Sequence, residues 1–170
     1  MSARKPAPSP RGGGSPFSAG RVFPRDVERA ERGDLPSAPV SVERITVGDG
    51  RMTLLVRLKP SCPRLTDSAM ARRLLADVPT LARHACVNEV GPTFGCVIAS
   101  TPLPHVLEHL VIDGQVRACA SFTDITFVGT TEWIDERAGL ARVEVNFADD
   151  LIALRALNDA LAYLNGEVVP

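Results

Sequence analysis

Two of the three histidines in this 170-residue chain lie four residues apart, close to the middle of the sequence. A glutamate directly precedes the second one in the run Pro104-His105-Val106-Leu107-Glu108-His109-Leu110. Residues three and four apart share a face of an α-helix. A helix that begins near Pro104 and ends near Gly114 would present the two imidazoles and the carboxylate together. The segment therefore predicts a helix that carries these polar side chains on one face, and another part of the fold is expected to pack against that face.

These three side chains match the H-x-x-E-H pattern of one class of zinc hydrolases. In that pattern two neutral imidazoles bind the metal, and the carboxylate accepts a proton from the attacking water. The residues thus predict His105 and His109 as ligands of a divalent metal, with zinc as the expected ion, and Glu108 as the general base. Asp113 lies four residues beyond His109 and is a candidate third ligand or a hydrogen-bond partner of a ligand. The alternative is an ordinary helix whose polar face carries a Glu-His pair.

Composition narrows the class of protein. A net charge of −1 gives no overall positive field that would favour nucleic acid or an anionic membrane as a partner. No apolar run approaches the roughly 20 residues of a membrane span, and the N-terminus lacks the apolar core of a secretory signal. The four cysteines are widely spaced and form no C-x-x-C pair, which favours reduced thiols and a cytoplasmic location.

The chain is predicted to divide into a tail and one domain. Residues 1–38 are rich in Pro, Gly, Ser and Arg, a composition typical of disordered segments. Residues 39–170 are predicted to form a single α+β domain. Its first part contains two strands, near 40–47 and 52–58, joined by a tight turn at Asp49-Gly50.

Helices and strands then follow in an order that suggests the fold. A helix capped by Thr66 or Asp67 is interrupted at Pro79, and the histidine-bearing helix comes next. Two strands near 120–133 and 140–147 precede a final leucine-rich helix that ends at Asn165-Gly166. The order β-β-α-α-β-β-α predicts a mostly antiparallel sheet of about four strands with three helices on one face.

Residues 79–165 resemble the N-terminal domain of cyanophycin synthetase. The resemblance is carried by Pro79, Leu81, His84 and Cys86, by the run His105–Gln115, by Phe127–Trp133 and by Val143–Asp150. In that family the domain holds a growing Asp-Arg polymer, and in some members it is similar to a metallohydrolase that cleaves the polymer. The histidine-bearing helix also resembles that of the pitrilysin and insulinase peptidases.

The resemblance implies a metal-dependent hydrolase of a peptide or isopeptide bond, acting on a cyanophycin-like polymer. It implies Glu132 as the first choice for the third ligand, ahead of Asp113 and His84, since Glu132 keeps its place in the family-like segment. The expected partners are a peptide or polymer substrate and either a second copy of the chain or a separately encoded ligase.

The departures from the family favour a second interpretation. Gly129 and Thr131 replace two arginines that would suit carboxylate recognition, and these 170 residues contain no counterpart of the family's ligase domains. A non-catalytic module that binds a polymer, peptide or protein is therefore the alternative. A third interpretation makes the two histidines part of a structural metal site.

Overall fold

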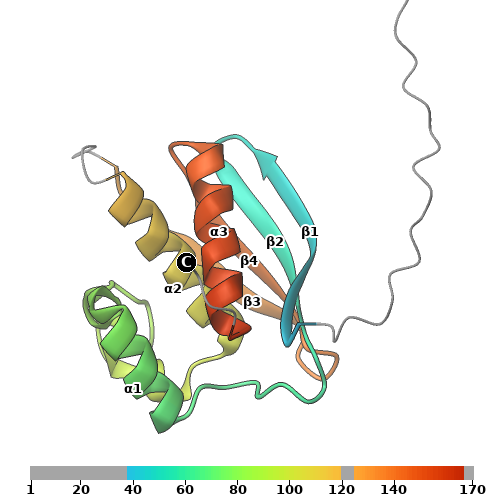
Figure 1. Ribbon diagram of the computed structural model, residues 1–170, viewed down its shortest axis with the longest axis vertical. Coiled ribbons are helices and arrows are strands. Elements are labelled where there is room, and N and C mark those ends of the chain that lie inside the picture. Colours follow the sequence, from blue (N-terminus) through green and yellow to red (C-terminus); the bar gives the residue numbers. More distant parts are fainter. Residues whose placement is uncertain (1–37, 120–124, 167–170) are drawn as a thin grey trace, which may run out of the picture. The chain divides into compact units, whose positions relative to one another are not determined.

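A computed structural model describes residues 38–119 and 125–166 (Figure 1). The strands are β1 (Val40–Gly48), β2 (Arg51–Leu58), β3 (Gly129–Asp135) and β4 (Leu140–Asn146); the α-helices are α1 (Ser68–Asp77), α2 (Leu103–Ala118) and α3 (Asp150–Leu164); and the short 3-10 helices are η1 (Pro79–Arg83), η2 (Phe94–Cys96) and η3 (Ile98–Ser100). The predicted α+β class and element order are confirmed. Nearly all of the predicted tail, and residues 120–124 of a predicted strand, lie outside the described residues.

The sheet is antiparallel throughout and has the strand order β1-β2-β4-β3. Asp49 and Gly50 connect β1 to β2 with φ values of 51° and 70°. Positive φ at both central residues matches the right-handed twist of a two-residue hairpin, which explains the Asp-Gly pair. The turn predicted from the sequence is therefore present.

Every second residue of the two central strands is buried on the same face of the sheet. These residues are Met52, Leu54, Val56 and Leu58 on β2 and Ala141, Val143 and Val145 on β4. Helices α2 and α3 cover this face, with α2 against β3 and β4 and the end of α3 near β1 (Figure 1). The alternation therefore places the hydrophobic core between the sheet and these two helices.

The last helix is fixed at both ends by short polar side chains. Asp149 caps α3 by accepting a hydrogen bond from the backbone of Ile152 at 3.0 Å. Asn165, just past the other end, exchanges two hydrogen bonds with the backbone of Val40, at 2.9 and 3.0 Å. These hydrogen bonds thus join the start of β1 to the end of α3, the first and last elements of the described domain.

Helix α2 is one turn longer than its sequence suggested, because it continues past Gly114 to Ala118. Gly114 does not end the helix; it is the point at which α3 packs closely against α2. A Cβ atom at this position would lie 2.8 Å from the Cβ of Ala156 on α3. Gly114 therefore allows α2 and α3 to approach closely. In contrast, Pro79 does interrupt the earlier helix as predicted, and α1 ends at Asp77.

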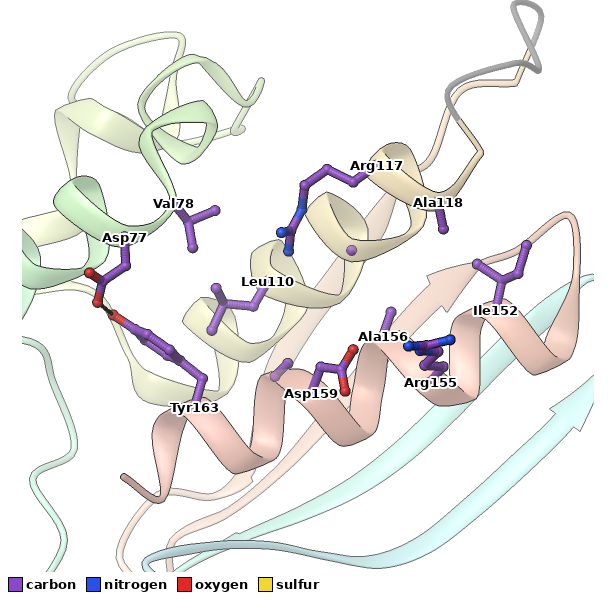
Figure 2. Close-up of a pocket in the computed structure, with 12 residues that line it drawn as sticks. Asp77, Val78, Leu110, Arg117, Ala118, Ile152, Arg155, Ala156, Asp159 and Tyr163 are labelled. Carbon is purple, nitrogen blue, oxygen red and sulfur yellow. Dashed lines mark hydrogen bonds between the residues drawn. The ribbon is translucent and has the colours of Figure 1, made fainter. Parts of the chain in front are cut away.

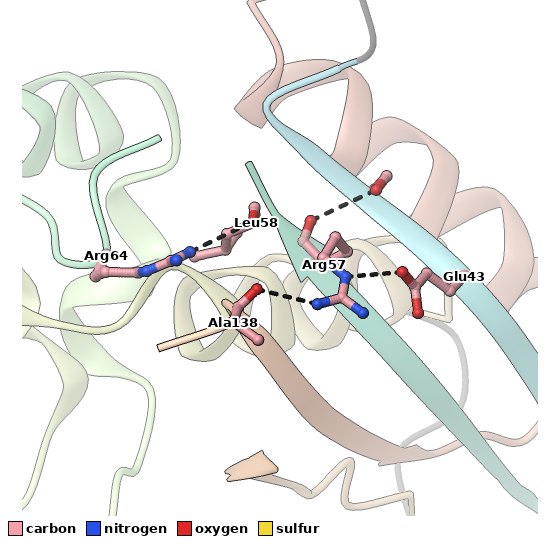
Figure 3. Close-up of polar contacts among 6 residues, drawn as sticks. Glu43, Arg57, Leu58, Arg64 and Ala138 are labelled. Carbon is pink, nitrogen blue, oxygen red and sulfur yellow. Dashed lines mark hydrogen bonds and ion pairs between the residues drawn. The ribbon is translucent and has the colours of Figure 1, made fainter. Parts of the chain in front are cut away.

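Arginines hold the loops at one end of the sheet (Figure 3). Arg57 pairs with Glu43 on the neighbouring strand at 2.7 Å and donates to the carbonyl of Ala138 at 3.0 Å. Arg64 donates to the carbonyl of Leu58 at 3.4 Å. These groups are partly exposed, so their contribution to stability is small and their effect is mainly on loop position.

None of the helices within the described ranges is both long and apolar enough to cross a bilayer.

Candidate metal centre

Helix α2 carries three polar side chains at intervals of four residues along one face. His105 is half-buried, while His109 and Asp113 are 3% and 1% exposed. A spacing of four residues stacks side chains one turn above another. This face packs against η1, and Phe94 of η2 lies against its two histidine rings, so its polar groups must find partners in that segment.

The segment that follows η1 folds back on itself and brings two more donor groups to α2. Phe94 N donates to the carbonyl of His84 at 2.8 Å, Cys86 N donates to that of Pro92 at 3.2 Å, and Ala85 pairs with Thr93 in a β-bridge. Residues two apart in an extended segment point the same way. The fold-back therefore turns His84 and Cys86 toward the helix together.

The imidazole and thiol groups form one connected cluster. His109 Nε2 lies 3.1 Å from His105 Nε2, and Cys86 Sγ lies 3.6 Å from the same His105 nitrogen. On its other side, His109 Nδ1 lies 3.3 Å from His84 Nδ1. Within the described part of the chain, the ligand atoms of Cys86, His105 and His109 all lie within 4.8 Å of one another and could hold a metal ion.

Two of the three separations among these ligand atoms are close to those expected for tetrahedral zinc. With bonds of about 2.0–2.1 Å to nitrogen and about 2.3 Å to sulfur, two ligand nitrogens lie about 3.3 Å apart and a nitrogen and a sulfur about 3.6 Å apart. The measured separations are 3.1 Å between the two Nε2 atoms and 3.6 Å between His105 Nε2 and Cys86 Sγ. The soft thiolate and the two imidazoles also suit zinc chemically.

The surroundings keep the two α2 histidines neutral. Burial lowers the pKa of His105. Burial, together with the neighbouring His105 and His84, lowers the pKa of His109 to about 3. Phe94 supplies much of the apolar cover, since its ring stacks on His109 at a centroid distance of 4.0 Å. A neutral imidazole is the form that binds a metal, so both residues are prepared for that role at neutral pH.

Glu108 lies between the two histidines in sequence but points to the sheet. Thr131 on β3 donates to its Oε2 at 2.6 Å, and a Cβ atom on Gly129 would lie 2.7 Å from its Oε1. Burial raises the pKa of Glu108, although the Thr131 hydrogen bond opposes the shift. Gly129 and Thr131 thus serve the carboxylate, one by leaving room and the other by donating a hydrogen bond.

The structure does not bring Glu132 to the cluster. Thr131 faces Glu108, so the next residue of the strand points to the opposite side of the sheet. There Glu132 is exposed and pairs with Arg142 at 2.8 Å. Asp113 contacts His84 rather than His105 or His109 directly, through an oxygen 3.4 Å from His84 Nε2. Cys86 supplies the third candidate ligand, which sequence reasoning did not select, although it is one of the residues that carry the family resemblance.

A cavity of about 570 Å³ lies elsewhere, between α2 and α3 on the side where α1 ends (Figure 2). Small and apolar residues such as Leu110 and Ala156 line its floor, and Tyr163 donates to Asp77 at 2.7 Å at its edge. No residue of the Cys-His cluster lines it. The cavity is therefore separate from the candidate centre.

The raised pKa of Glu108 predicts a pH-dependent effect of Glu108→Gln on the metal-free protein. Between the ordinary value of 4.5 and the raised folded value, the folded state binds more protons than the unfolded state. The wild type therefore loses free energy of unfolding as pH rises through that window, whereas the glutamine variant does not. In urea unfolding with a chelator present, the free energy of unfolding of the variant relative to that of the wild type should increase as pH rises above 4.5. A relative free energy of unfolding that decreases as pH rises would contradict the raised pKa of Glu108.

Comparison of the chain with protein-family models, with curated proteins and with solved structures finds no match. The candidate centre is therefore defined by its own geometry: two histidines one turn apart on α2 and a cysteine from the fold-back segment. The buried Glu108 lies on the same helix, with its carboxylate turned to β3.

Proposed function

We propose that the protein is a zinc-dependent hydrolase of a peptide or isopeptide bond. Cys86, His105 and His109 are the metal ligands, and Glu108 is the general base. The observation that carries the proposal is the convergence of one thiol and two neutral imidazoles within 4.8 Å, with the two separations from His105 Nε2 at 3.1 and 3.6 Å, on a helix that also carries a buried carboxylate. Three protein ligands are the arrangement typical of catalytic zinc, which keeps its fourth position open.

The side chains of the proposal have distinct tasks. Held by Cys86, His105 and His109, a zinc ion would supply Lewis-acid chemistry that activates water and polarises a carbonyl group. Glu108 takes up a proton from the attacking water and passes it to the leaving amine. Burial raises its pKa toward the operating pH, which suits a group that must both accept and release a proton. Thr131 donates its hydrogen bond to Oε2, so Oε1 is the oxygen proposed to accept the proton.

The substrate class rests on the resemblance to the cyanophycin synthetase domain. The strand beside Glu108 has Gly129 and Thr131 where that family has arginines. In this chain both positions contact Glu108 instead of offering positive charge. A peptide or isopeptide bond with little acidic character around it is therefore the preferred substrate within this class.

A structural zinc is the second candidate function for the same ligands. It is favoured by the near-complete burial of His109 and by the short 3-10 turns of residues 79–100, which a metal would tie to α2. Structural sites contribute folding energy directly and need no nearby base. The two candidates differ in whether the zinc-loaded protein cleaves a bond.

Metal analysis of Cys86→Ser tests the ligand set. The wild type, purified without added metal, is expected to contain one equivalent of zinc by mass spectrometry, and the serine variant clearly less after dialysis, because serine is a poorer zinc ligand than thiolate. Cys96→Ser is the matched control, since Cys96 is exposed and lies outside the cluster. Equal zinc retention by Cys86→Ser and the wild type would overturn the ligand assignment.

A further inference from the structure

We propose that the cavity between α2 and α3 binds a short peptide with free ends and apolar side chains, about three residues long. The proposal goes beyond the hydrolase function, because no residue of the Cys-His cluster lines the cavity and binding there requires no metal. Three features of the cavity carry it: the small side chains of its floor, the placement of its charges, and its length.

The floor of the cavity is built from small and aliphatic side chains. Gly114 and Ala156 bring α2 and α3 into close contact, since a Cβ atom on Gly114 would lie 2.8 Å from the Cβ of Ala156. Leu110 and Ala160 continue this floor and are buried. The small side chains leave a hollow of about 570 Å³ above the contact between the helices. A largely apolar hollow of this size between two helices is typical of small-ligand sites.

Charged side chains stand beside this floor on successive turns of α3 (Figure 2). Arg155 comes first, and Asp159 follows one turn later. One turn further, Tyr163 donates to Asp77 Oδ2 at 2.7 Å, and the guanidinium of Arg73 lies over the Tyr163 ring at 5.0 Å. A positive group therefore lies toward one end of the cavity and two carboxylates lie toward the other.

Two of these charges have no partner of their own. Within the described part of the chain, neither Arg155 nor Asp159 forms an ion pair, although Asp159 is half-buried. Arg117, the other cation of the lining, is already engaged, since its Nε lies 2.8 Å from Asp113 Oδ2. A ligand with one negative and one positive end compensates both free charges, whereas a simple anion or cation compensates only one. The cavity thus favours a zwitterion.

The spacing of the charges along α3 sets the length of the ligand. A rise of about 1.5 Å per residue separates Arg155 from Asp159 by about 6 Å and from Tyr163 by about 12 Å. Three residues of an extended peptide span about 10 Å. The carboxylate of such a peptide would pair with Arg155, and its ammonium group would pair with Asp159 and Asp77. Its apolar side chain would cover the floor between them.

Titration of the full chain with alanyl-leucyl-alanine, followed by NMR of the backbone amides, tests the site. The amide signals of Gly114 and Ala160 are expected to shift. Acetylation of the amino end of the peptide, or amidation of its carboxyl end, should each weaken binding about threefold to tenfold, as expected for one charge-assisted contact in a partly exposed site. Shifts confined to Cys86 and His109 would place the peptide at the metal centre and overturn the proposal.

Two variants assign the ends of the peptide. Arg155→Gln should weaken the unmodified peptide by the same factor and leave the affinity for the amidated peptide unchanged, because that peptide has no carboxylate. The double variant Asp77→Asn/Asp159→Asn should likewise spare only the acetylated peptide. Arg72→Gln is the matched control, since Arg72 is exposed on α1 and does not line the cavity. The site is refuted if the unmodified peptide binds the wild type more weakly than about 10 mM, or if both modified peptides bind as tightly as the unmodified one.

Discussion

Glu108→Gln is expected to retain zinc and to lose hydrolysis by about 10²–10⁴-fold, the usual contribution of a general base. Glutamine keeps the shape of the side chain and can still accept the Thr131 hydrogen bond, which measures 2.6 Å in the wild type. It cannot take a proton from water at neutral pH. The rate would be measured as new amino groups released from an Asp-Arg polymer and from a mixed peptide library, with zinc content determined on the same samples.

Glu132→Gln is the matched control for this experiment. Glu132 lies on the opposite side of β3 and pairs with Arg142, so its variant should cleave as fast as the wild type and hold as much zinc. Loss of zinc in this variant would instead support Glu132 as the third ligand, as the resemblance implied. If Glu108→Gln keeps full activity, Glu108 is not the general base. If the wild type holds zinc but cleaves no bond, the zinc has a structural role only.

Much of the fold could be predicted because its signals are local. The Asp49-Gly50 pair specifies its own turn, and the alternation along 52–58 specifies which side of β2 is buried. The predicted end of α2, near Gly114, was wrong for a physical reason. Gly114 normally suggests a helix end, but here it packs against Ala156, and that contact involves a helix about 40 residues away in sequence.

The candidate centre was only half predictable, for the same reason. His105 and His109 share a helical face by spacing alone, so the sequence identifies them as a pair. Cys86 joins them through the fold-back that pairs Ala85 with Thr93, which no spacing rule reveals. Glu132 illustrates the opposite difficulty: a shift of one residue along a strand reverses the face, and the sequence alone left that parity open.

Phe94→Ala is expected to destabilise the protein by about 3–5 kcal/mol and also to weaken zinc binding. Phe94 is completely buried in η2 and stacks on His109 at 4.0 Å while meeting the ring of His105 edge-on at 5.6 Å. Removing the ring leaves a cavity and admits water beside two imidazoles whose neutral state depends on burial. Urea unfolding of the metal-free protein would measure the first effect, and competition with a chelator the second.

Two further variants separate the cavity from the site. Met52→Ala, in the sheet at β2, removes an equally buried side chain and should cost about 2–5 kcal/mol without changing zinc affinity in the folded protein. Phe94→Leu should recover much of the stability but not the stacking on His109. If Met52→Ala lowers zinc affinity as much as Phe94→Ala does, zinc binding follows global stability, and Phe94 has no separate part in shaping the centre.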